Sequence, residues 1–137
     1  MENRAKLKYI ELKKMIDSLN ESLYLVELNK DYRFEKSLKD SVIQRFEYTS
    51  EGIWKFLKSV LLEDFSKDEA FAKSVLKSSY KAGIIEELDI FLDMIERRNR
   101  LSHDYHEDFS ETSFDIISKD YIEPINKLLS NFSKNYE

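Results

Sequence analysis

The sequence contains no cysteine and has only two glycines and one proline among its 137 residues. The absence of cysteine excludes a disulfide framework and thiolate zinc sites, and it is compatible with a reducing cytoplasm. So few glycine and proline residues could hardly form the many tight turns of an all-β fold. The composition therefore favours long helices joined by few connections.

No apolar run approaches the roughly 18 residues that a membrane-spanning helix needs. The charged first segment, MENRAKLKYIELKK, lacks the apolar stretch of a secretion signal, so we expect a cytoplasmic protein with no membrane contact. The formal net charge of -5 argues against broad, non-specific binding of nucleic acid, because neutralising phosphates needs a basic surface. Any contact with RNA must be local.

The chain nevertheless has ample material for a core. Hydrophobic residues make up 42% of it and include nine Phe, eight Tyr and one Trp, which excludes a disordered tail. A chain of this length commonly forms one domain, here residues 1–137. We predict an all-α fold: an antiparallel up-and-down bundle of about five helices.

Apolar side chains that recur every three or four residues predict the first two helices, over about 3–29 and 38–62. Gly52 lies inside the second helix and costs it about 1 kcal/mol relative to alanine. Either the close approach of another backbone or neutral drift accounts for this glycine. We assign it no catalytic role.

Capping signals delimit the later helices. Ser66 and Glu69 form a capping box that predicts the start of a third helix, and Gly83 marks its end. A fourth helix begins near residue 85, and Asp108 offers a capping signal for the last one. Pro124 should kink the last helix or split it in two.

The chemistry is concentrated in the segment RNRLSHDY, residues 98–105. Arg98 offers a planar fork of donors for phosphate oxygens, and His103 can take and give a proton near neutral pH. On a straight helix these two side chains lie about 140° apart. They can converge only if the helix ends near Ser102 or if a second subunit completes the site. From the spacing alone, a basic helix end favoured by the helix dipole is the simpler interpretation.

Metal binding by this segment is a weak alternative. Asp104, His106, Glu107 and Asp108 could join His103 around an ion, but such acidic runs are usually solvated loops and no ordered ligand spacing accompanies them. We therefore predict no metal site and no cofactor.

The same segment resembles the signature of the HEPN superfamily, in which an arginine, a polar residue, a short spacer and a histidine are followed by any residue and a tyrosine. Arg98, Asn99, His103 and Tyr105 match this signature in turn. Residues 40–58 (DSVIQRFEYTSEGIWKFLK) and 78–108 resemble the nucleotidyltransferase substrate-binding branch of that superfamily.

This branch consists of five-helix bundles that dimerise, with the arginine and histidine of both subunits lining a shared cleft. Its members are typically encoded beside a minimal nucleotidyltransferase. Four residues of the second helix belong to the branch pattern: Gln44, Arg45, Glu47 and Trp54. We expect Arg45 and Glu47 to pair with other helices or to line the cleft, and Trp54 to lie in the core or in the dimer interface.

The resemblance implies the toxin of a type VII-like toxin–antitoxin pair, a homodimeric, metal-independent endoribonuclease. His103 would act as general acid or base and Arg98 would stabilise the pentacovalent phosphate, with Asn99 and Ser102 supporting them. The partner nucleotidyltransferase, acting as antitoxin, would adenylylate Tyr105. Ordinary aromatic packing is the competing interpretation of this tyrosine.

A second hypothesis is a binding module. In it, the same cleft holds a nucleotide or another substrate for the partner nucleotidyltransferase and cuts nothing. A purely structural adaptor is a third hypothesis, but it leaves the arginine and histidine without a purpose.

Overall fold

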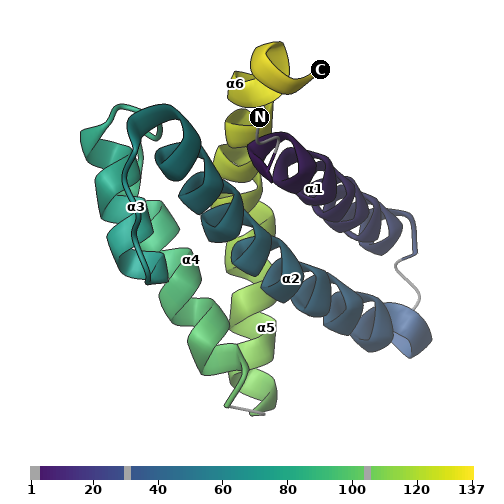
Figure 1. Ribbon diagram of the computed structural model, residues 1–137. Coiled ribbons are helices and arrows are strands. Elements are labelled where there is room, and N and C mark those ends of the chain that lie inside the picture. Colours follow the sequence, from purple (N-terminus) through teal and green to yellow (C-terminus); the bar gives the residue numbers. More distant parts are fainter. Residues whose placement is uncertain (1–3, 30–31, 104–105) are drawn as a thin grey trace.

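The computed structural model describes residues 4–29, 32–103 and 106–137, and in this part of the chain it contains helices and no strands. The elements are α1 (Arg4–Leu28), α2 (Tyr32–Phe65), α3 (Ala72–Lys81), α4 (Leu88–Leu101), α5 (Glu107–Ile116), the π-helix η1 (Ile117–Tyr121) and α6 (Ile122–Tyr136). Because α5, η1 and α6 follow one another without a gap, they form one rod in the bundle (Figure 1). The expected all-helical bundle of about five helices is confirmed.

The first two helices form a long hairpin, and α1 packs mainly on α2. Three α1 side chains that face the core, Leu12, Ile16 and Leu19, are at most 1% exposed. α2 is longer than the predicted range 38–62. The apolar stripe starts only at Leu38, whereas the preceding charged turns stay helical through ion pairs at a spacing of four, such as Lys39 with Glu35 at 2.8 Å.

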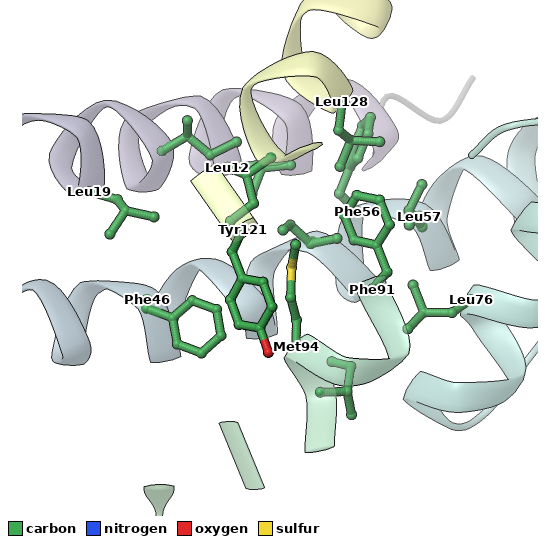
Figure 2. Packing of buried hydrophobic residues seen from close by; sticks show 14 of the residues in the cluster. Leu12, Leu19, Phe46, Phe56, Leu57, Leu76, Phe91, Met94, Tyr121 and Leu128 are labelled. Carbon is green, nitrogen blue, oxygen red and sulfur yellow. The ribbon is translucent and has the colours of Figure 1, made fainter. Parts of the chain in front are cut away.

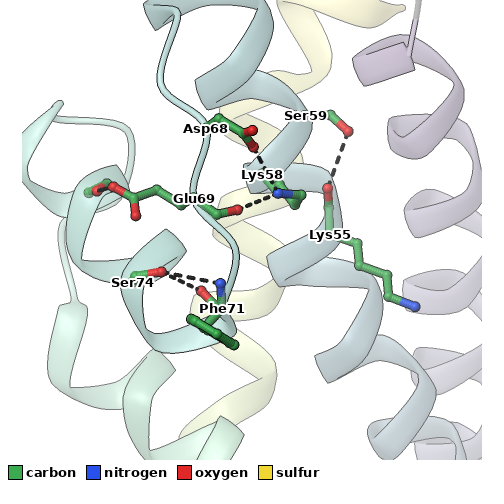
Figure 3. A network of polar contacts seen from close by, with 8 residues as sticks. Lys55, Lys58, Ser59, Asp68, Glu69, Phe71 and Ser74 are labelled. Atoms are coloured by element: carbon green, nitrogen blue, oxygen red, sulfur yellow. Dashed lines mark hydrogen bonds and ion pairs between the residues drawn. The ribbon is translucent and has the colours of Figure 1, made fainter.

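The capping box predicted at Ser66 and Glu69 is wrong. Residues 66–70 form a loop, and α3 begins only at Ala72, where the Ser74 hydroxyl accepts a hydrogen bond from the Phe71 backbone N–H (Figure 3). Glu69 is engaged elsewhere: its carboxylate accepts from Ser78 at 2.5 Å, and its backbone carbonyl accepts from Lys58 of α2. These contacts hold the loop against α2 and α3, so the helix begins later.

The ends of the other helices differ less from expectation. α3 ends at Lys81, and Gly83 adopts a φ of 78°, as its role at the helix end predicts. α4 begins at Leu88, about three residues later than expected, because the connecting turn is anchored by the buried Ile85. The capping role of Asp108 is wrong: α5 begins at Glu107, and Asp108 lies in its first turn, where the helix dipole favours an acid.

The last rod is interrupted near Pro124, where a kink or split was predicted, but the helical backbone remains continuous. Pro124 occupies the third position of α6, the helix that follows the π-helical turn η1. A proline supplies no N–H to the preceding turn, and a π-helical turn is one way of accommodating such a break in the α-helical ladder. The interruption places Tyr121 in the core with no exposed surface.

The core combines aliphatic side chains with aromatic rings and joins α2 to α4 and to the last rod (Figure 2). The rings of Phe46 and Tyr121 are stacked with centroids 5.3 Å apart, and Phe56 meets Phe132 edge-on at 4.8 Å. Trp54 is partly buried against this core, one of the two places expected for it. Met94, on α4, is 1% exposed, so the core fixes α4 against the middle of α2.

Candidate functional site

The candidate site lies where α4 ends. The helix stops at Leu101, and the backbone N–H groups of Ser102 and His103 donate to the carbonyls of Arg98 (3.2 Å) and Arg100 (3.0 Å). The last turn of α4 thus carries basic side chains, which the helix dipole favours at this end. His103 follows directly and is exposed.

Arg98 is half-buried against α2 and is weakly held there. Its Nη2 lies 3.4 Å from Oε1 of Glu51, and its Nη1 lies 3.5 Å from Oδ1 of Asn99. Its Nε is buried, and no acceptor for it is found in the described part of the chain. A guanidinium has five N–H donors, and these two long contacts leave several donors of the partly exposed Arg98 without a close acceptor among the described residues.

Two carboxylates of α2 face this end of α4. Glu47 and Glu51 are four residues apart and therefore share one face of the helix. Oε2 of Glu47 lies 3.5 Å from the Ser102 hydroxyl, which also donates to the Arg98 carbonyl at 3.2 Å. Burial raises the pKa of Glu47, while the charge of Arg98 and the hydrogen bond from Ser102 oppose the rise.

These contacts test the expectations for α2. Glu47 does reach another helix, as expected, and so does Arg45, whose Nε donates to the Ser18 hydroxyl of α1 at 2.8 Å. Glu51 was missed by the sequence reasoning. Its spacing of four from Glu47 is the signal that could have found it.

Arg97 lies next to Arg98 in sequence but has a different environment. Its Nη1 donates to the Ser113 hydroxyl at 2.9 Å and its Nε to the Tyr121 hydroxyl at 3.2 Å, while its guanidinium packs over the Phe109 ring. Tyr121 in turn donates to Asp93. Burial, reinforced by that hydrogen bond, raises the pKa of Tyr121. Arg97 therefore ties α4 to the last rod and is not available to a ligand.

The structure does not join all the predicted site residues within one protomer. In the described part of the chain, no hydrogen bond or ion pair links Arg98 or Asn99 to His103, and Asn99 is exposed. A surface groove beside the end of α4 is lined in part by Glu47, Leu101 and Ser110, but not by Arg98 or His103. Tyr105 lies outside the described residues.

The two remaining expectations concern metals and membranes. Within residues 4–29, 32–103 and 106–137, no group of three or more His, Cys, Asp or Glu side chains could hold a metal ion. Asp104, one member of the metal alternative, lies outside these ranges. Among the same residues, no helix is both long enough and apolar enough to cross a membrane.

The fold and the site together define a helical-bundle protein with a basic helix end followed by a histidine. The chain belongs to the family described as "Nucleotidyltransferase substrate binding protein like", whose sequence model matches residues 7–134. This is the HEPN-like branch that the sequence resembles.

A solved structure from Thermus thermophilus shares this fold. It superposes with a TM-score of 0.76 at 27% sequence identity, and the alignment covers 89% of this chain and 98% of that one. No curated protein matches the chain.

Proposed function

We propose that this protein is the HEPN toxin of a type VII-like toxin–antitoxin pair, a metal-independent endoribonuclease built from two protomers. The observation that carries the proposal is the state of Arg98: a half-buried guanidinium with a buried, unbonded Nε and only long contacts to its neighbours. Such a group is ready to bind a phosphate oxygen. His103, exposed just beyond the helix end, supplies a group that can transfer a proton.

The reaction that suits these groups is cleavage by the neighbouring ribose hydroxyl. His103 removes the proton of the 2'-hydroxyl, whose oxygen attacks phosphorus, and the bond to the 5'-oxygen breaks as that oxygen gains a proton from an imidazolium. Arg98 stabilises the negative charge of the pentacovalent phosphate. Asn99 and Ser102 support the site. The products are a 2',3'-cyclic phosphate and a 5'-hydroxyl.

Two protomers are part of the proposal for a geometric reason. Arg98 is turned toward α2, whereas His103 is exposed beyond the helix end, and no contact between them is found in the described residues of one protomer. A two-fold axis near the end of α4 would let His103 of one copy approach Arg98 of the other.

Regulation of the site is proposed to come from a partner nucleotidyltransferase. It would transfer adenylate from ATP to the hydroxyl of Tyr105, the tyrosine of the family signature: the tyrosine oxygen bonds to the α-phosphorus, pyrophosphate leaves, and the hydroxyl proton is released. An added phosphate within the signature segment would compete with RNA for the guanidinium of Arg98 and repel the RNA backbone. Incubation with such an enzyme and ATP should add the mass of one or more adenylates to wild-type protein but not to Tyr105→Phe. Equal modification of both proteins would reject this assignment.

The cleavage test compares wild-type protein with His103→Ala in the presence of a chelator. We expect wild-type protein to cut RNA to ends bearing a cyclic phosphate, and His103→Ala to be inactive. His106→Ala, which removes the other histidine of the chain, serves as the matched control and should keep activity. Equal activity of wild-type protein and His103→Ala would remove the catalytic claim. Nucleotide binding without cleavage would instead support the alternative, a substrate-binding subunit of a two-component nucleotidyltransferase.

A further inference from the structure

The outer face of α1 carries apolar side chains that the chain leaves exposed. Leu7 and Leu28, near the two ends of the helix, are 62% and 60% exposed, and Ile10 and Leu25 are 41% and 38% exposed. α1 packs against α2 and α6 through its opposite side, and Figure 1 shows it at the edge of the bundle. Single exposed leucines are common, but four on one stripe of one helix call for an explanation.

Two opposite charges lie on the same stripe between these apolar ends. Other charged side chains of α1 form ion pairs along the helix, such as Lys13 with Asp17 at 3.4 Å. Lys14 and Glu21 form none with any residue that the structure describes. They are seven residues apart, which is about two helical turns, so they lie on the same side of α1 but too far apart to meet each other.

The stripe is symmetric about the middle of α1, between Asp17 and Ser18. Its members are Leu7, Ile10, Lys14, Glu21, Leu25 and Leu28. Counted outward from the midpoint, each apolar residue has an apolar residue at the same distance on the other side, and Lys14 has Glu21. A surface that matches itself in this way is what a two-fold axis requires.

We propose that the outer face of α1 is an interface between two copies of this chain, with the two α1 helices antiparallel. Leu7 of one copy then packs on Leu28 of the other, and Ile10 packs on Leu25. Lys14 of each copy meets Glu21 of the other, which gives both unpaired charges a partner. Exposed apolar area is buried at both ends of the contact.

This contact differs from the one that brings α4 ends together in the proposed nuclease, and it does not rest on that function. α2 separates α1 from α4, since α1 packs on α2 and α6 while α4 packs on α2, α3 and α5. One chain with two different two-fold contacts forms an assembly larger than a dimer. The α1 contact alone gives a dimer whose two α4 ends lie apart.

The decisive experiment exchanges the charges and measures the mass of the assembly by sedimentation across a range of concentrations. Lys14→Glu places four like charges at the centre of the contact and should weaken association through α1 by about tenfold or more. Lys14→Glu combined with Glu21→Lys restores the opposite pairs and should restore association. Lys134→Glu, an equal change of charge on α6, should have no effect. The proposal would be overturned by any of three results: the wild-type protein is monomeric, Lys14→Glu leaves association unchanged, or the added Glu21→Lys fails to restore association.

A cross-link provides a second test, which needs no change of affinity. The chain has no cysteine, so a single introduced thiol can be addressed alone. In the antiparallel pair the two copies of residue 17 lie beside the two-fold axis, so Asp17→Cys should form a covalent dimer with a short bismaleimide. Lys134→Cys should not. Failure of Asp17→Cys to cross-link in protein that sediments as an assembly would refute this interface and leave the α4 contact as its source.

Discussion

Two adjacent arginines should give opposite results when each is replaced by alanine. Arg97 and Arg98 are neighbours on α4, yet Arg97 is bonded into the packing between α4 and the last rod, whereas Arg98 faces α2 with few contacts. Arg97→Ala is expected to lower stability and to leave the chemistry of the folded protein intact. Arg98→Ala is expected to abolish RNA cleavage with little loss of stability.

The cost of Arg97→Ala follows from its contacts. The hydrogen bond to Tyr121 contributes about 1 kcal/mol, and the Ser113 hydroxyl, which has no exposed surface, would lose its partner at a cost of about 1–3 kcal/mol. Loss of the packing over Phe109 adds about 0.5 kcal/mol. Together these give about 3 kcal/mol, which corresponds to a fall in Tm of about 10 °C for a domain of this size.

Arg98→Ala removes much less. Its ion pair with Glu51 is long, and both side chains are about one-third exposed, at 31% and 32%. Such pairs contribute about 0–1 kcal/mol, so Tm should fall by no more than about 3 °C. Urea unfolding gives the two free energies, and cleavage per folded molecule gives the two activities. Equal destabilisation by the two substitutions, or loss of cleavage by folded Arg97→Ala, would refute the division of roles.

Three further changes test other parts of the structure. Burial raises the pKa of the Glu47 carboxyl above its usual 4.5, so the folded state binds the carboxyl proton more tightly than the unfolded state does. The protonated carboxyl therefore favours folding at low pH. This stabilisation is lost as the pH rises through the raised pKa. Glu47→Gln should therefore gain stability relative to wild type between about pH 4 and about pH 7 in urea unfolding, and an unchanged difference would contradict the shift. Gly83→Ala should lower the free energy of unfolding by about 1 kcal/mol, because alanine disfavours a φ of 78°. Steric overlap adds nothing, since no atom lies within 4 Å of the new Cβ. An unchanged urea midpoint would contradict this prediction. Glu51→Gln in the His103→Ala background should tighten RNA binding about twofold to fivefold in fluorescence anisotropy, since Arg98 loses a competing carboxylate. Glu96→Gln, which ends the exposed ion pair with Lys73, is the control of equal charge, and equal tightening by both would exclude local competition.

The fold was predictable where apolar periodicity extends over many turns. The buried stripe of α1, with Leu12, Ile16 and Leu19, has that spacing, and so does the apolar part of α2. Helix starts were harder to predict, because a cap depends on which side chain reaches the backbone. Glu69 fits a capping box in sequence, yet Lys58 and Ser78 hold it in a loop, and both contacts come from other helices.

Gly52 shows the same limit of local reasoning. The sequence left open whether another backbone approaches it or whether the glycine has no purpose. In the structure, a Cβ at Gly52 would lie 2.7 Å from the Met15 sulfur and 3.4 Å from a methyl group of Leu12. Side chains of α1, rather than a backbone, therefore occupy the space, which only the packing of α1 on α2 could reveal.

At the candidate site, sequence could identify the α4 residues but not their surroundings. The segment from Arg97 to Arg100 contains three arginines, and nothing in their order tells which one is committed to the core. Arg97 is committed because it points at Ser113 and Tyr121, which lie 16 and 24 residues further along the chain. The carboxylate that meets Arg98 comes from α2, 47 residues earlier. Contacts at such separations are set by helix packing and leave no local pattern.

The same packing reconciles an acidic protein with an anion-binding role. The net charge of -5 is a sum over the whole chain, and at physiological salt charges further than about 8 Å from an exposed phosphate are largely screened. Near Arg98 the carboxylates on α2 are Glu47 and Glu51, and the last turn of α4 carries two arginines, Arg98 and Arg100. The local charge balance at this helix end is therefore less acidic than that of the whole chain. Because so few basic groups are involved, the salt dependence of RNA binding should be shallow, as expected for contact with only one or two phosphates.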